Sequence, residues 1–181
     1  MKTEISSDSL FLRAMEPQDE SFLYDIENRR EAFSVGENRI PFSHDYLQRF
    51  IYASLQENFL SSGQLRLVAC CGEDTELHPE QAVGILDFFN YDSFHRRAET
   101  GIVVCPGYRN KGMGEKILTL ACDYARNQLN LHQLYAEVAA NNEGSLKLFE
   151  KCGFERCGLR RQWLLQAGEW VDTVLWQKIF G

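Results

Sequence analysis

The segment RNKGMG, Arg109 to Gly114, combines residue types that bind an anionic group. It follows the apolar stretch GIVV and precedes a helical pattern, so it is predicted to lie where a strand gives way to a helix. Backbone N–H groups at a helix start have no partner inside the helix, and the helix dipole favours negative charge there. Glycines let the backbone approach a ligand closely, and Arg109 and Lys111 add positive charge. The segment therefore predicts a pyrophosphate site rather than a site for a single carboxylate.

Two common phosphate-binding motifs match this segment less well. A Rossmann fingerprint needs a third glycine and a place after the first strand, whereas this segment follows the fourth predicted strand. A Walker P-loop needs Gly-Lys followed by Ser or Thr, which the segment lacks. A plain turn would account for Gly112 and Gly114 but not for the basic residues before them.

The elements that must position this segment follow from the hydrophobic pattern and the turn residues. Helices are predicted at 21–33, 44–59, 114–129 and 142–153, because apolar residues recur there at helical spacing. Strands are predicted at 10–15, 64–71, 81–91, 96–104 and 133–140, and 159–179 is predicted to form a hairpin that turns at QAGE. The pattern indicates an α+β fold with a mixed sheet of about seven strands and about four helices, in which the second to fourth strands form an antiparallel meander.

Composition limits the class of protein. With 181 residues and 44% apolar content, residues 1–181 are expected to form a single domain. The net charge is −7, from −9 over residues 1–100 and +2 over 101–181, and without a basic block this disfavours nucleic acid as a partner. No membrane span or signal peptide is indicated, so a cytoplasmic location is expected. The six cysteines include no CxxC pair and the four histidines are scattered, so reduced thiols and no metal site are expected.

Two motifs in order resemble the GNAT superfamily of N-acetyltransferases. VVCPGYRNKGMGEKIL is similar to its acyl-CoA signature, Arg or Gln followed by x-x-Gly-x-Gly/Ala after the fourth strand. NNEGSLKLFEKCGF is similar to its second signature, an Asn-x-x-Ser/Ala that leads to Gly-Phe. The resemblance is closest to the bacterial spermidine/diamine and ribosomal-protein N-terminal acetyltransferases. It implies the GNAT fold, in which the fourth and fifth strands splay apart.

The resemblance also implies how acetyl-CoA would bind. The backbone around Val103 and Val104 would pair with the pantetheine arm. The amides of the pyrophosphate loop would hold the diphosphate; they belong to Arg109, Asn110, Lys111, Gly112, Met113 and Gly114. Asn142 would contact the cofactor arm, and Ser145 is either a second contact or a residue of the helix surface. Acetyl-CoA is the cosubstrate that this predicts.

The implied reaction transfers the acetyl group to a primary amine in a ternary complex. The amine must lose a proton, attack the thioester and expel a thiolate. Glu99 and Glu137 are the base candidates, since the resemblance places both strands beside the cleft; the alternative is that both face solvent. The acceptor is expected to be a polyamine-like small molecule or a peptide N-terminus, because the first half of the chain is acidic. The pattern fits a monomer and a homo-oligomer equally.

Two departures from the family pattern leave roles open. Phe149 stands where many members carry a tyrosine that returns a proton to the thiolate, so a water or another donor, such as Tyr135 or Cys152, would have to supply that proton. A non-catalytic acyl-CoA-binding domain is therefore the alternative function. The loop GENRIPFSHD also lacks the paired acidic stretch of polyamine-acetylating relatives, which leaves the acceptor open.

Overall fold

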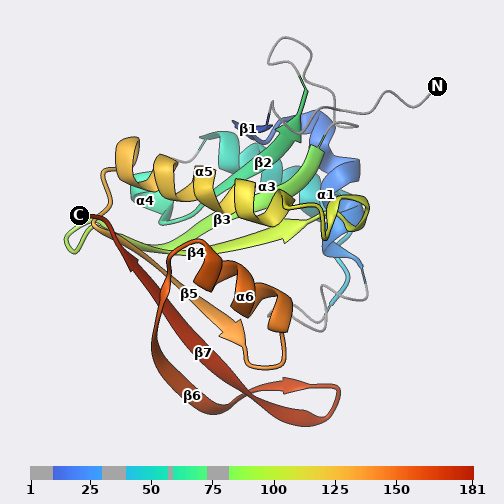
Figure 1. The fold of residues 1–181 in the computed structure, drawn as a ribbon. Coiled ribbons are helices and arrows are strands. Elements are labelled where there is room, and N and C mark those ends of the chain that lie inside the picture. The colour runs from blue at the N-terminus through green and yellow to red at the C-terminus, as the bar shows by residue number, and fades with distance from the viewer. Residues whose placement is uncertain (1–9, 30–39, 57–58, 73–81) are drawn as a thin grey trace.

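One mixed sheet organises the chain. The structure, a computed structural model, describes residues 10–29, 40–56, 59–72 and 82–181. The sheet has seven strands in the order β1-β2-β3-β4-β5-β7-β6 (Figure 1). The strands are β1 (Leu10–Ala14), β2 (Leu65–Cys71), β3 (Ala82–Asp92), β4 (Arg97–Val104), β5 (Gln133–Ala139), β6 (Glu155–Gln166) and β7 (Glu169–Ile179). Neighbouring strands are antiparallel except β4 and β5, which are parallel. The predicted α+β class and meander are confirmed.

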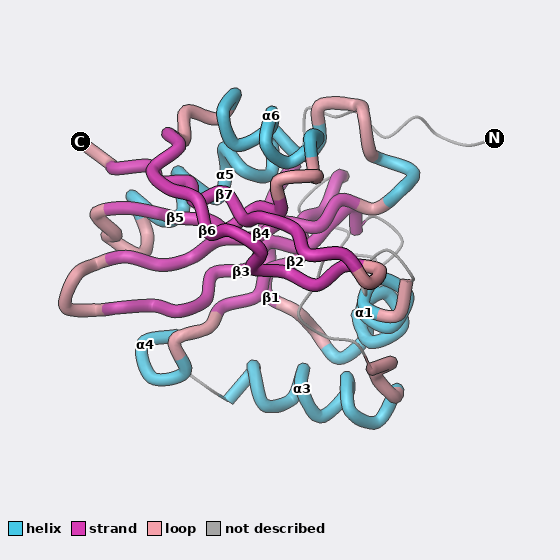
Figure 2. Tube along the Cα trace, turned by 90° about the horizontal axis from the view of Figure 1, so that it is seen from below, coloured by secondary structure: helices cyan, strands magenta, loops and turns pink. Residues whose placement is uncertain are grey.

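Helices cover both faces of the sheet. They are α1 (Glu20–Glu27), α3 (His44–Gln56), α4 (Phe59–Ser62), α5 (Met113–Asn127) and α6 (Glu143–Lys151). Figure 2 shows α5 and α6 on one side of the sheet, with α1, α3 and α4 on the other. The short helix α4 was not predicted as a separate element. Within the described ranges, no helix has the length and apolarity needed to cross a membrane.

Helix α1 is shorter than predicted. The pattern extended it to Phe33, but the helix ends at Glu27; residues 30–33 of that prediction lie outside the described residues. Asn28, which follows the last helical residue, donates its side-chain amide to the carbonyl of Phe42 at 3.0 Å and accepts from the N–H of Phe42 at 2.8 Å. Asn28 is held by this tertiary contact, and the helix ends just before it. Hydrophobic spacing alone therefore predicted a longer helix.

The central strands bury side chains on both faces. Cys70 belongs to a hydrophobic cluster with Leu23 and Ile51 of α1 and α3, whereas Cys71 belongs to a cluster with Ile117 of α5. Adjacent residues of a strand point to opposite faces, as predicted for these two cysteines. Both thiols are buried, and burial raises the pKa of each. The two hydrophobic clusters therefore pack on opposite faces of this one sheet.

The parallel pair β4–β5 separates along its length. The two strands pair at Arg97 with Gln133, at Ala98 with Leu134 and at Glu99 with Tyr135. Beyond this point β4 continues beside β3 as far as Val104, and β5 continues beside β7 as far as Ala139. The predicted splay is confirmed. Among the strands that the structure describes, none pairs with the edge of β4 that faces β5 over residues 100–104.

Gly84 marks a close approach between β3 and β4, and substitution there should destabilise the fold. A Cβ at this position would lie 2.4 Å from the carbonyl oxygen of Val103 and 3.1 Å from Cδ1 of Ile117. We expect Gly84→Ala to lower the free energy of unfolding by about 1–3 kcal/mol, measured by chemical denaturation.

Gly101→Ala on β4 is the matched control. Its Cβ would meet only Cε1 of Phe89, at 3.7 Å, and a change within about 0.5 kcal/mol is expected. Equal losses in both variants would show that the contact with Val103 is not the cause.

Candidate functional site

A cleft of about 790 Å³ opens beside the separated part of β4 and β5. Its wall combines the end of β4, the start of α5, the start of α6 and the end of α1. These segments are distant in the sequence, and the sheet brings them together. The cleft is thus bounded on one side by the strand edge at Val103 and Val104, and on another by the glycine-rich start of α5.

Most of the predicted cofactor residues lie in this wall. The lining contains Val103, Val104, Arg109, Asn110, Gly112, Met113, Gly114, Asn142 and Ser145. Of the predicted binding residues, all of which the structure describes, Lys111 alone lies outside the lining. Its ammonium donates to the carbonyl of Gly107 at 2.8 Å, so its side chain closes the preceding turn. The structure therefore brings the two sequence motifs to one cavity.

The start of α5 has the geometry of an anion-binding helix end. Gly112 is the N-cap residue with φ 74°, a left-handed conformation that favours glycine. Glycine has no side chain with which to cap the first N–H groups, so these remain for a ligand. Arg109 is anchored to the end of β4, because its Nε donates to the carbonyl of Val104 at 3.0 Å.

The start of α6 is built differently. The Oδ1 of Asn142, the N-cap residue, accepts from the backbone N–H of Ser145 at 3.1 Å. This cap fixes the direction of the Asn142 side chain within the cleft wall. Asn142 therefore has a structural role in addition to any role toward a ligand.

Four charged residues of the wall were missed by sequence reasoning, and one of them, Glu115, is in the first turn of α5. Glu27 and Arg29 enter it from the end of α1, and Lys151 from the end of α6. Glu27 is paired with Arg66 of β2, whose guanidinium also binds Asp87 of β3. Nothing in the local sequence around α1 indicates that it reaches the end of β4, because that approach results from packing across the sheet.

The predicted base candidates lie outside the described wall of the cleft. Glu99 is 9% exposed, and its carboxylate accepts from the side-chain amide of Asn90 at 2.9 Å. Glu137 forms an ion pair with Arg160, whose guanidinium lies over the ring of Trp163. Both glutamates are on the sheet face opposite α5 and α6, next to the point where β4 and β5 separate.

Tyr135 joins Glu99 in a polar cluster at this point. The two residues are direct neighbours across the last β4–β5 pair, and the side-chain amide of Asn90 donates to Glu99 close to Tyr135. Burial, and then the negative charge of Glu99, raise the pKa of Tyr135, so the phenol stays protonated at neutral pH. Asn90 was missed because its position depends on an irregularity of β3 between Phe89 and Asp92.

Phe149 and Cys152 are turned away from the cleft wall. Phe149 is 4% exposed and packs edge-on against Phe154, with ring centroids 4.9 Å apart. The Cys152 thiol donates to the carbonyl of Glu115 at 3.9 Å, and burial raises its pKa. Among the described residues, neither lines the cleft, and the Cys152 thiol is already used in its contact with Glu115 on the α5 side of the sheet.

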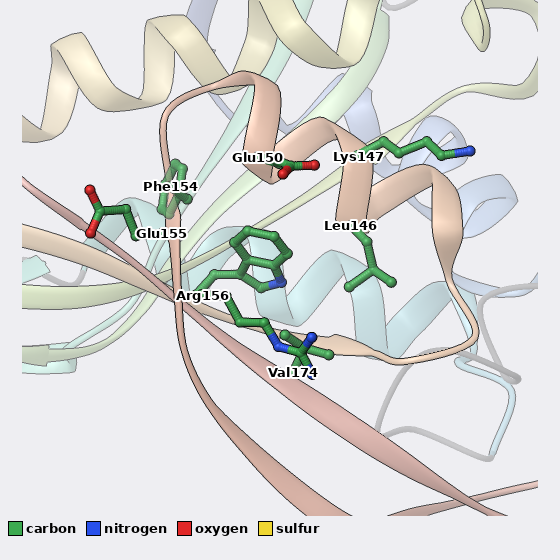
Figure 3. A pocket seen from close by; sticks show the side chains of 8 residues that line it. Leu146, Lys147, Glu150, Phe154, Glu155, Arg156 and Val174 are labelled. Carbon is green, nitrogen blue, oxygen red and sulfur yellow. The ribbon is translucent and has the colours of Figure 1, made fainter.

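A second cavity, of about 480 Å³, lies against another face of α6 (Figure 3). Its lining residues come from α6, from the start of β6 and from β7: Leu146, Lys147, Glu150, Phe154, Glu155, Arg156, Val174 and Trp176. It contains none of the predicted site residues. The first cavity, where the sequence motifs meet, is therefore the candidate site.

The chain is similar to known proteins in both sequence and fold. The family model for the acetyltransferase (GNAT) domain matches residues 9–155. Spermidine N(1)-acetyltransferase of Vibrio cholerae is 30% identical over 145 residues, which cover 80% of this chain and 78% of the relative. The crystal structure of spermidine N-acetyltransferase from V. cholerae in complex with CoA and spermine has a TM-score of 0.84 and 25% identity over 96% of each chain. A dodecameric structure of the V. cholerae enzyme has a TM-score of 0.79 and 25% identity, covering 96% of this chain and 95% of that one.

The match covers the greater part of the chain, and it includes both the glycine-rich start of α5 and the Asn142 motif. Fold, motif order and sequence similarity agree, and the chain belongs to the GNAT acetyltransferase family.

Proposed function

We propose that residues 1–181 form a single domain that transfers the acetyl group of acetyl-CoA to a primary amine while both reactants are bound. The observation that carries this proposal is the cleft between the unpaired edge of β4 and the uncapped glycine start of α5. Holding two reactants together can supply much of the rate, because an intermolecular step becomes effectively unimolecular.

The residues of the cleft fit the parts of acetyl-CoA. Amides from Arg109 to Gly114 would bind the pyrophosphate, aided by the dipole of α5 and the guanidinium of Arg109. Backbone groups of Val103 and Val104 would hydrogen-bond with the pantetheine amides, since this edge of β4 has no paired strand on the side of β5. Asn142 and Ser145 would border the arm from the start of α6.

We propose that the acceptor is a polyamine-like small amine. The similarity to spermidine acetyltransferases supports this class. Glu99 and Glu137 support it as well, because both carboxylates lie next to the point where β4 and β5 separate and would attract a cationic amine. The dodecameric V. cholerae structure supports a homo-oligomer. A peptide N-terminus is the competing acceptor.

Glu99 is the proposed general base, acting through a water. It is almost buried, and its carboxylate accepts from the side-chain amide of Asn90 at the last β4–β5 pair, where the two strands separate. Glu137 would have to give up its ion pair with Arg160 before it could take a proton, so its proposed role is to attract the ammonium of the acceptor. Tyr135 is the proposed source of the proton for the thiolate, because Phe149 has no proton to donate and is packed in the core.

The proposed function is tested with pure protein, acetyl-CoA and a panel of amines. The panel contains spermidine, spermine, putrescine, an amino acid and a peptide with a free N-terminus, and released thiol is measured. We expect thiol release that depends on the polyamines. Binding of CoA without any amine-dependent release would instead support the non-catalytic acyl-CoA-binding function.

Replacing the proposed base should slow the chemical step. Glu99→Gln keeps the shape and the contact with Asn90 but cannot take a proton, so kcat should fall about 100-fold, with an unchanged Kd for CoA. Glu169→Gln, an exposed carboxylate beside the β6–β7 turn, is the control and should keep the full kcat. A Glu99→Gln variant with normal kcat would remove this residue from the mechanism.

Removing the Tyr135 hydroxyl should also reduce turnover. The pKa of Tyr135 is raised above the ordinary value of about 10, so its phenol stays protonated throughout pH 7–9. Deprotonation of Tyr135 should therefore not lower the wild-type kcat over this range. Tyr135→Phe should lower kcat about ten-fold across this range and leave the Kd for CoA unchanged. Tyr124→Phe, on α5, is the control. Equal kcat values for the two variants would rule out Tyr135 as the donor.

A further inference from the structure

The start of α5 carries a negative charge at the end where the proposed cofactor phosphates bind. Glu115 is the third residue of α5, and it lines the cleft. A carboxylate in the first turn stabilises a helix through the helix dipole. The same charge repels an anion bound to that helix end. The requirements of the helix and of the ligand therefore conflict at Glu115.

Lys151 neutralises this carboxylate from a different helix. Its Nζ lies 2.6 Å from Oε2 of Glu115, and both residues line the cleft. Lys151 is the last residue of α6, where the helix dipole favours a cation. The hydrogen bond with Glu115 raises the pKa of Lys151, so this ammonium is charged at neutral pH.

The other carboxylate of the described wall has a partner as well. Glu27 is paired with Arg66, which reaches it from β2. The described wall carries Arg29, Arg109 and Lys151 against Glu27 and Glu115, so its formal charge is positive. Loss of Lys151 would remove a cation and expose the charge of Glu115 to the phosphates.

We propose that Lys151 is the counter-charge that cancels the repulsion between Glu115 and the cofactor phosphates, so that this ion pair sets the affinity for CoA alongside the motif residues. The inference rests on the proposed function, because its ligand is CoA. For charges about 8 Å apart near a protein surface, Coulomb repulsion corresponds to a change in affinity of roughly three- to thirty-fold.

The test is the Kd for CoA of four proteins, measured by titration calorimetry at low salt: wild type, Lys151→Met, Glu115→Gln and the double variant. We expect Lys151→Met to bind CoA about five- to ten-fold more weakly than wild type. The double variant should recover affinity to within about two-fold of wild type, because the charge that Lys151 opposes is gone. The loss in Lys151→Met should shrink at about 0.5 M salt through screening.

Lys147→Met is the matched control. Lys147 lies one turn earlier on α6, pairs with Glu143 at 3.5 Å and is 78% exposed, against 65% for Lys151. It borders the second cavity (Figure 3) and is outside the described wall of the first. This variant loses the same charge as Lys151→Met, but outside the described wall of the cleft. Its Kd for CoA should therefore stay at the wild-type value.

Three outcomes would overturn the inference. Equal CoA affinity of Lys151→Met and wild type would show that the pair has no effect. A double variant as weak as Lys151→Met would mean that Lys151 acts by direct contact and not through Glu115. Wild-type protein that does not bind CoA would overturn the proposed function as well, which the first two outcomes leave intact.

Discussion

The separation of β4 from β5 after the pair Glu99–Tyr135 is the constraint on which the rest of the site depends. Each strand keeps its other neighbour: β4 stays with β3, and β5 stays with β7. The two parts of the sheet therefore diverge while each strand keeps its hydrogen bonds to that other neighbour. The divergence creates a free strand edge, and the helices that follow β4 and β5 then begin on either side of one cleft.

Both cleft helices begin at this opening, but their first turns are stabilised in different ways. At α6 the side chain of Asn142 caps the backbone, so that end is satisfied within the protein. At α5 the cap is Gly112 in a left-handed conformation, which provides no side-chain acceptor. Unsatisfied N–H groups make a helix end an anion site, and this difference between the two caps is why the phosphates are proposed to bind at α5.

Acidic groups around the opening are held by specific partners. Arg66 joins Glu27 and Asp87, Arg160 holds Glu137, and Lys151 holds Glu115. Glu99 accepts from the side-chain amide of Asn90, close to Tyr135. These partners fix the directions of the carboxylates around the opening.

The sequence by itself determined the sheet class, the strand and helix order and the two motifs, because local hydrophobic period and glycine position encode these features. That the two motifs meet at one site was implied by their resemblance to the GNAT superfamily. Because Phe149 stands where many family members carry a tyrosine, the sequence also indicated that another group would have to protonate the thiolate. Only tertiary structure decided the end of α1 at Glu27, the entry of Arg29 and Lys151 into the cleft, and the Asn90–Glu99–Tyr135 cluster. These features join residues far apart in the chain, and their contacts depend on packing across the sheet, which no local pattern carries.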